Sequence, residues 1–263
     1  MCAPNGARKT KENHIALPIS AEELADCAES ILLAGASIMH LHVRDDEGRH
    51  SLSADRYRAA TDAIRDRVDD RLVIQITTEA CGMYEAEQQM ETVRKLKPEA
   101  VSLALKELCP DKASEPIARD FFSWLEGEGV MAQYILYSPE EVARFVTLRA
   151  KGVIPDVRPF VLFVLGRYSD DLTGDPAELE GFAAELDGET EWAVCCFGAT
   201  EQKAALLAAS RHGHARVGFE NNLLLPDGTI ATDNAQLVQS AVDAGRLEHR
   251  EPATAQDVRG MFG

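Results

Sequence analysis

Ala36-Ser37-Ile38-Met39-His40-Leu41-His42 is the stretch that decides how the rest of the chain is interpreted. Its apolar run predicts a β-strand, and side chains two residues apart on a strand point to the same face. His40 and His42 would then lie side by side at the strand end, where they could bind one metal ion. On a helix the same two imidazoles would diverge by roughly 200°. The metal hypothesis therefore depends on the strand.

Short apolar runs of this kind alternate with amphipathic stretches along the chain. A capping box at Ser20 and Glu23 opens the first predicted helix, and Gly35 follows its end. Strands are predicted at 36–42, 72–77, 100–105, 130–136, 160–165, 192–197 and 215–219, with a short or truncated strand at 1–4 as the eighth. Helices are predicted at 20–34, 54–68, 85–96, 116–127, 138–150, 176–186, 200–210 and 232–244.

Eight strand-then-helix units in about 250 residues is the count of a (β/α)8 TIM barrel. Strands that are apolar on both faces also fit a parallel sheet covered by helices. We therefore predict a single TIM-barrel domain over 1–263. A doubly wound open sheet would give the same alternation, so periodicity alone leaves it as an alternative.

The composition restricts the partners. The net charge is −17, with 44 acidic against 27 basic residues, which argues against nucleic acid because binding it needs clustered positive charge. An anionic substrate would need a local basic pocket. Six cysteines without a CxxC pair favour a reduced, cytoplasmic protein. No apolar run reaches transmembrane length, so no membrane partner is expected.

In a barrel the reactive groups gather at the carboxyl ends of the strands. His40, His42 and a carboxylate from another strand would give zinc two nitrogens and one oxygen and leave a fourth position open for substrate. Glu220 is the preferred third ligand because its strand closes the barrel near the histidines, and Glu79 is the competitor. The alternative is that one histidine is a hydrogen-bonded core residue. His50 and His249 are expected on the surface.

Several further stretches resemble the β-keto acid cleavage enzyme family, of which 3-keto-5-aminohexanoate cleavage enzyme is the named member. The resemblance spans nearly the whole chain, and its most specific parts are the two stretches that carry the candidate ligands. The stretches are His-Leu-His-x-Arg-Asp (40–45), Ala-Pro-Asn-Gly-Ala (3–7), Leu-Pro-Ile-Ser (17–20), Gln-Ile-Thr-Thr (75–78), Lys-Pro-Glu (97–99), Phe-Val-Leu-Gly (163–166), Arg-Val-Gly-Phe-Glu-Asn-Asn (216–222) and Ala-Thr-Asp-Asn-Ala (231–235).

The resemblance implies a TIM barrel that is zinc-dependent and forms homo-oligomers, either dimers or tetramers. Its members condense a β-keto acid with acetyl-CoA and release acetoacetate and a new acyl-CoA by a reverse-Claisen route. His40, His42 and Glu220 would bind zinc or another divalent transition metal, and Arg216 matches an arginine implicated in catalysis. The hydroxyl residues that would contact substrate are Thr77, Thr78 and Ser102.

Two departures from the family pattern affect the chemistry. Asn221 stands where the named enzyme has an aspartate associated with proton abstraction, so Glu79 or Glu107 is expected to take the proton and Asn221 to contact substrate. Arg8 replaces a glutamate that lies near the substrate amino group, and an arginine favours a carboxylate or another anion. Glu79 replaces a small residue and could serve a cation or pair with Arg8. The charge of the substrate is therefore left open.

Two other functions are compatible with the chain. Amidohydrolase-like metal-dependent hydrolases also carry a His-x-His pair on a barrel strand, but they need further histidines and an aspartate at later strand ends. A metal-binding barrel with little catalytic activity is the other alternative, because Asn221 cannot act as a carboxylate base.

Overall fold

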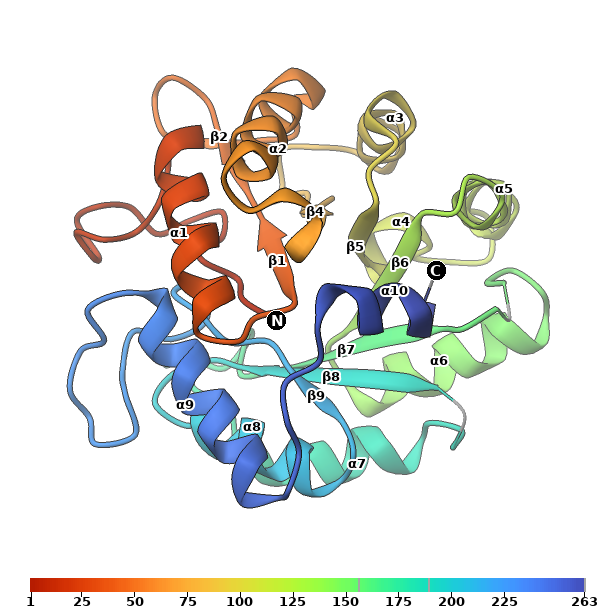
Figure 1. Cartoon of the computed structure of the whole chain (residues 1–263). Coiled ribbons are helices and arrows are strands. Elements are labelled where there is room, and N and C mark those ends of the chain that lie inside the picture. The colour runs from red at the N-terminus through yellow and green to blue at the C-terminus, as the bar shows by residue number, and fades with distance from the viewer. Residues whose placement is uncertain (156, 189, 263) are drawn as a thin grey trace.

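One parallel sheet forms the centre of the molecule, whose computed structural model describes residues 1–155, 157–188 and 190–262. Seven strands pair in the order β1-β4-β5-β6-β7-β8-β9, and helices surround the curled sheet (Figure 1). Strand order follows chain order without a reversal, which excludes the doubly wound alternative. The strands are β1 (Ile38–Leu41), β4 (Val73–Thr77), β5 (Ala100–Ala104), β6 (Met131–Leu136), β7 (Phe160–Leu165), β8 (Glu191–Cys196) and β9 (His214–Ala215).

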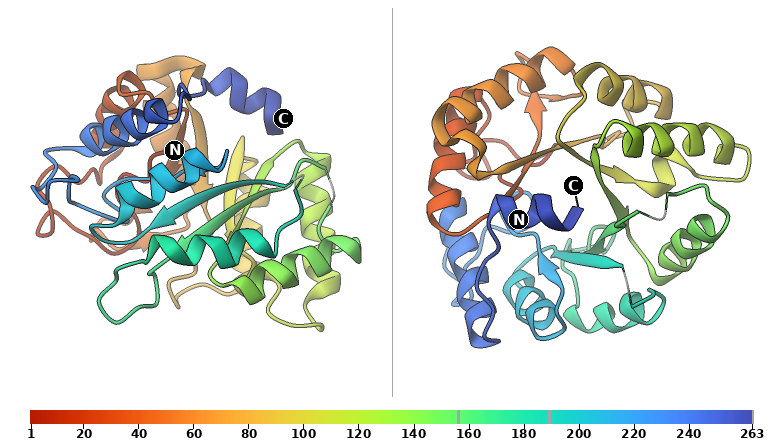
Figure 2. Two further views of the ribbon diagram at one scale, coloured as in Figure 1. Left: turned by 90° about the horizontal axis from the view of Figure 1, so that it is seen from below. Right: turned by 45° about the vertical axis from the view of Figure 1, so that its right-hand side comes forward.

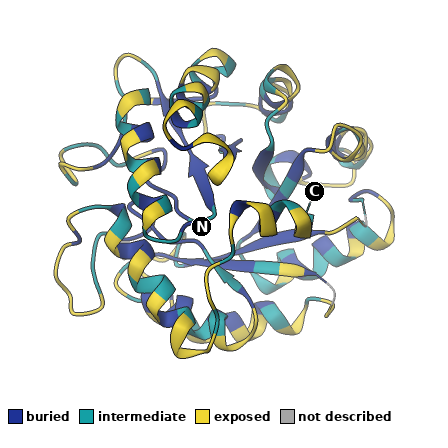
Figure 3. Cartoon of the chain, in the orientation of Figure 1, coloured by how far each residue is buried: buried dark blue, intermediate teal, exposed yellow. Residues whose placement is uncertain are grey.

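The helices form a ring around the strands, as the right-hand view of Figure 2 shows. Their outward faces are exposed, whereas the strands are buried (Figure 3). The ring consists of α1 (Ala21–Leu33), α2 (Ala54–Val68), α3 (Ala86–Leu96), α5 (Glu115–Gly127), α6 (Pro139–Ala150), α7 (Leu179–Ala184), α8 (Glu201–Ser210) and α9 (Asn234–Leu247). Within the described ranges no helix has both the length and the apolar character needed to cross a membrane.

Most predicted elements are confirmed within two residues at each end. The helix predicted at 232–244 ends three residues too early, because α9 continues to Leu247, and the other differences lie in short elements. The strand predicted at 215–219 is too long, because β9 stops at Ala215 and the backbone turns at Gly218. The helix predicted at 176–186 is divided into η2 (Pro176–Glu178) and α7. Sequence analysis missed η1 (Asp69–Arg71), α4 (Leu105–Leu108), α10 (Ala255–Phe262) and the antiparallel pair β2 (Val43–Arg44) and β3 (His50–Ser51).

The interior of the curled sheet is apolar near the amino ends of the strands and polar near their carboxyl ends. Alternate residues point into the curl, where Ile38, Val73, Phe160 and Leu162 belong to one buried apolar cluster. The residues that face outward from the sheet pack against the ring of helices in a second, larger cluster. His40 stands two residues after Ile38 on the same strand, so it also faces the interior of the curl.

The amino-terminal segment lies between the two edges of the sheet. Cys2 makes single parallel bridges to Met39 of β1 and to Val217 after β9. Its N–H donates to the carbonyl of Ile38 at 2.9 Å, and Ala3 N–H donates to the carbonyl of Val217 at 2.8 Å. The predicted first strand is thus represented by one bridged residue, and the described sheet has seven strands rather than the eight expected.

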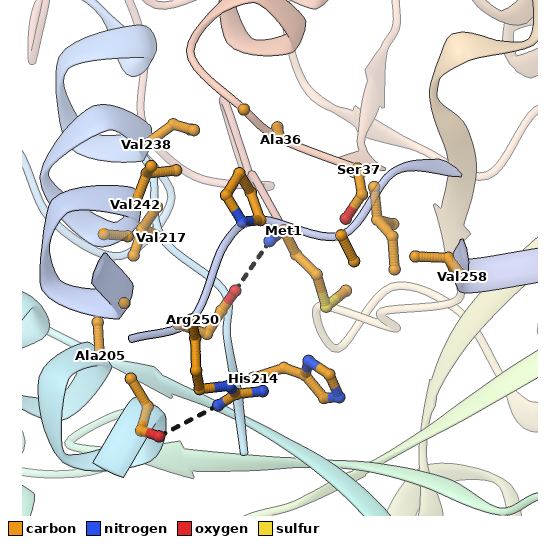
Figure 4. Close-up of a pocket in the computed structure, with 18 of the residues that line it drawn as sticks. Met1, Ala36, Ser37, Ala205, His214, Val217, Val238, Val242, Arg250 and Val258 are labelled. Atoms are coloured by element: carbon orange, nitrogen blue, oxygen red, sulfur yellow. Dashed lines mark hydrogen bonds between the residues drawn. The ribbon is translucent and has the colours of Figure 1, made fainter. Parts of the chain in front are cut away.

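Helix α10 covers the end of the sheet where the strands begin. Figure 1 shows it lying across the middle of the ring. Phe262 stacks on Phe160 at the start of β7, with ring centroids 4.4 Å apart. A pocket of about 250 Å³ lies beside this helix, bordered by residues that precede or open strands, among them Ala36 and His214 (Figure 4). This pocket is therefore at the amino ends of the strands, away from the candidate ligands.

The close approach of Gly218 to the amino-terminal segment gives a stability prediction. Gly218 has φ +133°, and a Cβ there would lie 2.5 Å from the carbonyl oxygen of Ala3. Gly218→Ala should lower the free energy of unfolding by about 1–3 kcal/mol, the usual cost of such backbone strain, as measured by chemical denaturation. Gly127→Ala is the control, because Gly127 is helical with open space around it, and it should be neutral or slightly stabilising. Equal effects of the two substitutions would contradict the prediction.

Candidate metal centre and active site

The two histidines converge as the strand interpretation predicted. His40 is on β1 and His42 follows its last residue, and the two Nε2 atoms are 3.0 Å apart. Both side chains are buried. The Nδ1–H of His40 donates to Oε1 of Gln75 at 2.9 Å, which leaves the lone pair of Nε2 facing His42. A histidine held in this way by its second nitrogen is typical of a metal ligand.

Glu220 supplies the third candidate ligand. Its Oε2 lies 3.6 Å from Nε2 of His40 and 3.3 Å from Nε2 of His42. The backbone of Gly6 packs closely against this side chain, since a Cβ at Gly6 would lie 2.6 Å from Cγ of Glu220. His40, His42 and Glu220 thus form a possible metal site, and Glu79 does not share it.

The three atoms have the spacing that a metal ion requires. Ligands about 2.1 Å from a tetrahedral zinc ion lie about 3.4 Å from one another, which is close to the observed 3.0, 3.3 and 3.6 Å. Oε2 of Glu220 is buried without a hydrogen-bond partner among the described residues. Such an oxygen is costly to bury unless a cation or donor satisfies it, so the donor set fits a divalent metal.

Burial and nearby charges favour the metal-binding forms of two candidate ligands, His40 and Glu220. Burial lowers the pKa of His40 to about 3, and the nearby Arg216 acts in the same direction. Burial alone would raise the pKa of Glu220, but Arg216 and the two histidines hold it well below its usual range. His40 is therefore a neutral donor and Glu220 a carboxylate at neutral pH, as metal binding requires.

A chain of buried polar side chains contacts His40 on the side of the apolar interior. Gln75 Nε2 donates to Oε1 of Gln133 at 3.2 Å, and the hydroxyl of Ser102 is 3.4 Å from Nδ1 of His40. Thr77 follows on the same strand as Gln75, and its Oγ1 accepts the backbone N–H of Glu79 at 3.0 Å. Ser102 and Thr77 were predicted from the sequence, whereas the roles of Gln75 and Gln133 were not, although both glutamines stand at inward positions of their strands.

Arg216 is buried beside the ligands with unused donors. Its Nη2 is 3.3 Å from Oε1 of Glu220 and 3.4 Å from Sγ of Cys195. Nε and Nη1 have no hydrogen-bond partner among the described residues. The same guanidinium borders a cavity of about 30 Å³ with His40, His42 and Glu220. This arrangement can hold an anionic oxygen next to a bound metal.

Glu79 borders the same cavity and is paired with arginines. Its Oε1 accepts a hydrogen bond from Nη1 of Arg8 at 2.5 Å and lies 3.8 Å from Nη2 of Arg167. Its Oε2 lies 4.0 Å from Nδ1 of His42. Burial alone would raise the pKa of Glu79, but His42 and Arg8 lower it below the usual value. The pairing of Glu79 with Arg8 that the sequence suggested is confirmed.

Five predicted site residues do not line the small cavity. They are Arg8 and Ser102, whose contacts are given above, together with Glu107, Thr78 and Asn221. Glu107 accepts the N–H of Ala80 at 3.0 Å, and its pKa is raised by burial. Thr78 donates to the carbonyl of Ser102 at 3.3 Å. Asn221 is directed at Cys195, with Nδ2 3.7 Å from Sγ, and borders a neighbouring pocket.

The small cavity beside the candidate ligands is called the inner cavity from here on. The neighbouring pocket has about 420 Å³ and opens beside it. The larger one, the outer pocket, shares Glu79, Arg167, Phe197 and Glu220 with it. Its remaining lining combines the loop at 5–9, Gly198 and the two asparagines Asn221 and Asn222 with the apolar side chains Leu172, Leu223, Leu224 and Ile230. A larger molecule in the outer pocket could therefore present one end to the candidate metal.

The expectation that His50 is a surface residue is wrong. The β2–β3 hairpin folds it back so that its ring centre lies 5.5 Å from that of His42 and it is 4% exposed. Its Nε2–H donates to the carbonyl of Glu79 at 2.7 Å. The turn residues Asp45 to Arg49, closed by a hydrogen bond from Asp45 N–H to the Arg49 carbonyl, were the missed signal. His249 is exposed as expected.

A curled parallel sheet that carries a candidate metal set at its carboxyl end, beside an arginine with two unpartnered nitrogens among the described residues, is typical of metal-dependent α/β enzymes. A family model described as beta-keto acid cleavage enzyme matches residues 1–263, and the chain belongs to this family. It is similar to the 3-keto-5-aminohexanoate cleavage enzymes of Acetoanaerobium sticklandii (30% identity, 98% of this chain and 95% of that protein) and Fusobacterium nucleatum (31%, 98% and 94%). It is also similar to the 3-oxoadipate:acetyl-CoA acetyltransferase of Cupriavidus necator (24%, 99% and 93%).

Solved structures bear on the fold alone. The complex of ObcA with oxaloacetate superposes with a TM-score of 0.73 over 94% of this chain and 67% of that chain, at 16% identity. Type I 3-dehydroquinate dehydratase from Clostridium difficile superposes with a TM-score of 0.60 over 94% and 91%, at 9% identity. The fold is therefore α/β with TIM-barrel-like neighbours.

The candidate ligands give a metal-binding prediction. His40→Ala and Glu220→Ala should each lose the bound metal, as measured by elemental analysis of the purified proteins. Gln75→Leu should weaken metal affinity by about 10- to 100-fold, because it removes the partner that orients His40. His249→Ala, an exposed histidine, should retain full occupancy. Full occupancy in the first two variants would contradict the ligand assignment.

Proposed function

We propose that this protein is a zinc-dependent β-keto acid cleavage enzyme that condenses a β-keto acid with acetyl-CoA and releases acetoacetate and a new acyl-CoA. One observation carries the proposal. In this member of the family, His40, His42 and Glu220 have the spacing of metal ligands, and they border the same cavity as Arg216, whose Nε and Nη1 have no described partner. The relatives named above act on a β-keto acid or use acetyl-CoA according to their names.

We also propose the setting in which the reaction occurs. Residues 1–4, with Cys2 bridged on both sides, would be the short eighth strand of a TIM barrel that forms one domain over 1–263. The six free cysteines favour a reducing, cytoplasmic location, and the family resemblance favours a homo-oligomer.

The inner cavity would bind the β-keto carboxylate. Zinc, held by His40, His42 and Glu220, would polarise the keto oxygen and stabilise the developing enolate charge. Arg216 would hold the carboxylate through Nε and Nη1, whose N–H groups have no other described partner. Thr77 and Ser102, close to the ligands, would border the substrate on the side of the sheet.

Glu79 is the carboxylate best placed to take the proton. It borders the inner cavity, whereas the Glu107 carboxylate is bonded to the Ala80 N–H outside it. Asn221 has no basic oxygen and borders the outer pocket, so it would contact the incoming thioester. Because His42 and Arg8 lower its pKa, Glu79 is ionised and ready to accept a proton at neutral pH.

The outer pocket would receive the acetyl end of acetyl-CoA. Its apolar wall, formed by Leu223, Leu224 and Ile230 among others, suits the pantetheine arm. Glu79 removes a proton from the carbon between the two carbonyls, and that carbon attacks the acetyl carbonyl and expels the CoA thiolate. The thiolate then adds to the original keto carbon. Cleavage of its bond to the central carbon gives the new acyl-CoA, and the proton held by Glu79 completes acetoacetate.

The reaction itself is the first test. Purified protein incubated with acetyl-CoA and a panel of β-keto acids should release acetoacetate and the matching acyl-CoA in equal amounts. Chelation should abolish the reaction and zinc should restore it. Arg216→Met should lower kcat/KM by about 10²- to 10³-fold, the usual cost of one preorganised donor. Cleavage of the keto acid by water without acetyl-CoA would contradict the proposal and favour the hydrolase alternative.

The base assignment has its own test. In D2O without acetyl-CoA, the protein should exchange the central methylene hydrogens of the β-keto acid, a signal that NMR detects. Glu79→Gln should slow this exchange by about 10²- to 10⁴-fold, the usual contribution of a general base. Glu107→Gln is the matched carboxylate control and should slow it far less. The reverse order would assign the proton transfer to Glu107.

A further inference from the structure

The entrance of the inner cavity carries an excess of positive charge on a strongly acidic chain. Arg8 and Arg167 both face Glu79, at 2.5 and 3.8 Å. Two guanidiniums thus share one carboxylate and leave a net charge of +1 at this point, although the whole chain carries −17. A locally reversed field of this kind attracts an anion.

Arg167 is the arginine with donors to spare. Within residues 1–155, 157–188 and 190–262, Glu79 is the one carboxylate within ion-pair distance of it, and that contact is long. The guanidinium is positioned instead by the rings of Tyr168 and Phe197, with its Cζ 5.7 and 5.6 Å from the ring centres. Ring contacts hold the plane of a guanidinium without using its N–H groups. Those N–H groups remain available to a ligand.

Glu79 is poorly placed to receive a cation. Its Oε1 is already bonded to Arg8, and its Oε2 is turned toward His42. The loop that carries Arg8 is itself held by Arg44, which donates to the carbonyls of Gly6 and Lys9. A substrate ammonium group would therefore have to displace Arg8 and lie next to Arg167.

Other anions in the reaction have different places. The carboxylate of the β-keto acid has the donors of Arg216 and the metal deeper in the inner cavity. The phosphates of CoA are separated from its thioester by the whole pantetheine arm, whereas Arg167 borders the inner cavity itself. The remaining group that can reach Arg167 is the far end of the β-keto acid.

We propose that the preferred substrate is a β-keto acid with a second, distal carboxylate, which Arg167 binds with Arg8 beside it. This inference rests on the proposed function and adds the charge class of the substrate. The family does not decide the question, since the names of relatives include both an amino-substituted acid and the dicarboxylate 3-oxoadipate.

Three six-carbon acids that differ in distal charge test the proposal: 3-oxoadipate, uncharged 3-oxohexanoate and 3-keto-5-aminohexanoate. With acetyl-CoA, kcat/KM should be at least tenfold higher for 3-oxoadipate than for 3-oxohexanoate, and it should be lowest for 3-keto-5-aminohexanoate. Without acetyl-CoA, calorimetric titration should give the same order of affinity, with the lowest Kd for 3-oxoadipate. Equal values for the three acids, or a preference for the amino acid, would overturn the proposal.

Single substitutions test whether Arg167 causes the preference for a distal carboxylate. Arg167→Met should reduce the ratio of kcat/KM between 3-oxoadipate and 3-oxohexanoate by at least tenfold, and Arg167→Lys should retain part of the preference because it keeps the charge. Arg8→Glu should shift the preference toward the amino acid. Arg246→Met removes the same charge from the surface of α9 and should leave the ratio unchanged. An unchanged ratio in Arg167→Met would overturn the assignment. Absence of acetoacetate with every acid would instead contradict the proposed function, and this inference with it.

Discussion

The position of the buried Glu220 carboxylate is the constraint on which the rest of this structure depends. Its Oε2 faces two imidazole nitrogens at 3.3 and 3.6 Å without another described partner. A carboxylate in such surroundings is stable when a cation neutralises it. The contact also requires that the segment after β9 return to β1, and the backbone bonds of Cys2 and Ala3 to both edges bring that about. The same backbone bonds that connect the two sheet edges therefore also bring Glu220 next to the two histidines.

The site is organised as layers along the inside of the curl. The amino end is apolar and covered by α10, the middle carries the hydrogen-bonded Gln75 and Gln133, and the carboxyl end carries the ligands and Arg216. The middle layer orients His40 and separates the charged site from the dry core. Beyond the ligands, Glu79 joins the metal region to two arginines. Charge thus alternates outward from the ligands, which gives each end of a β-keto acid a different environment.

The sequence predicted the long elements and the convergence of His40, His42 and Glu220 on one possible metal site, because both depend on local patterns. A strand of period two makes His40 and His42 converge, and the order of strands brings Glu220 near them. The rest depends on tertiary contacts. A strand that is apolar on both faces does not show in its sequence which face turns inward, so the role of Gln75 could not be predicted. The burial of His50 depends on the hairpin that follows His42. Helix α10 did have a local signal, since Thr254 and Asp257 cap each other's backbone N–H groups, but eight residues lie below the length that periodicity detects well.

The account centres on a metal ion between β1 and the turn that carries Glu220. The most direct test is anomalous diffraction on crystals of the purified protein, measured on both sides of the zinc absorption edge. The account predicts one strong anomalous peak that appears only above the edge, about 2.0–2.3 Å from Nε2 of His40, Nε2 of His42 and Oε2 of Glu220. A fully zinc-loaded protein whose peak lies elsewhere, or whose three side chains bond one another with no peak between them, would contradict it.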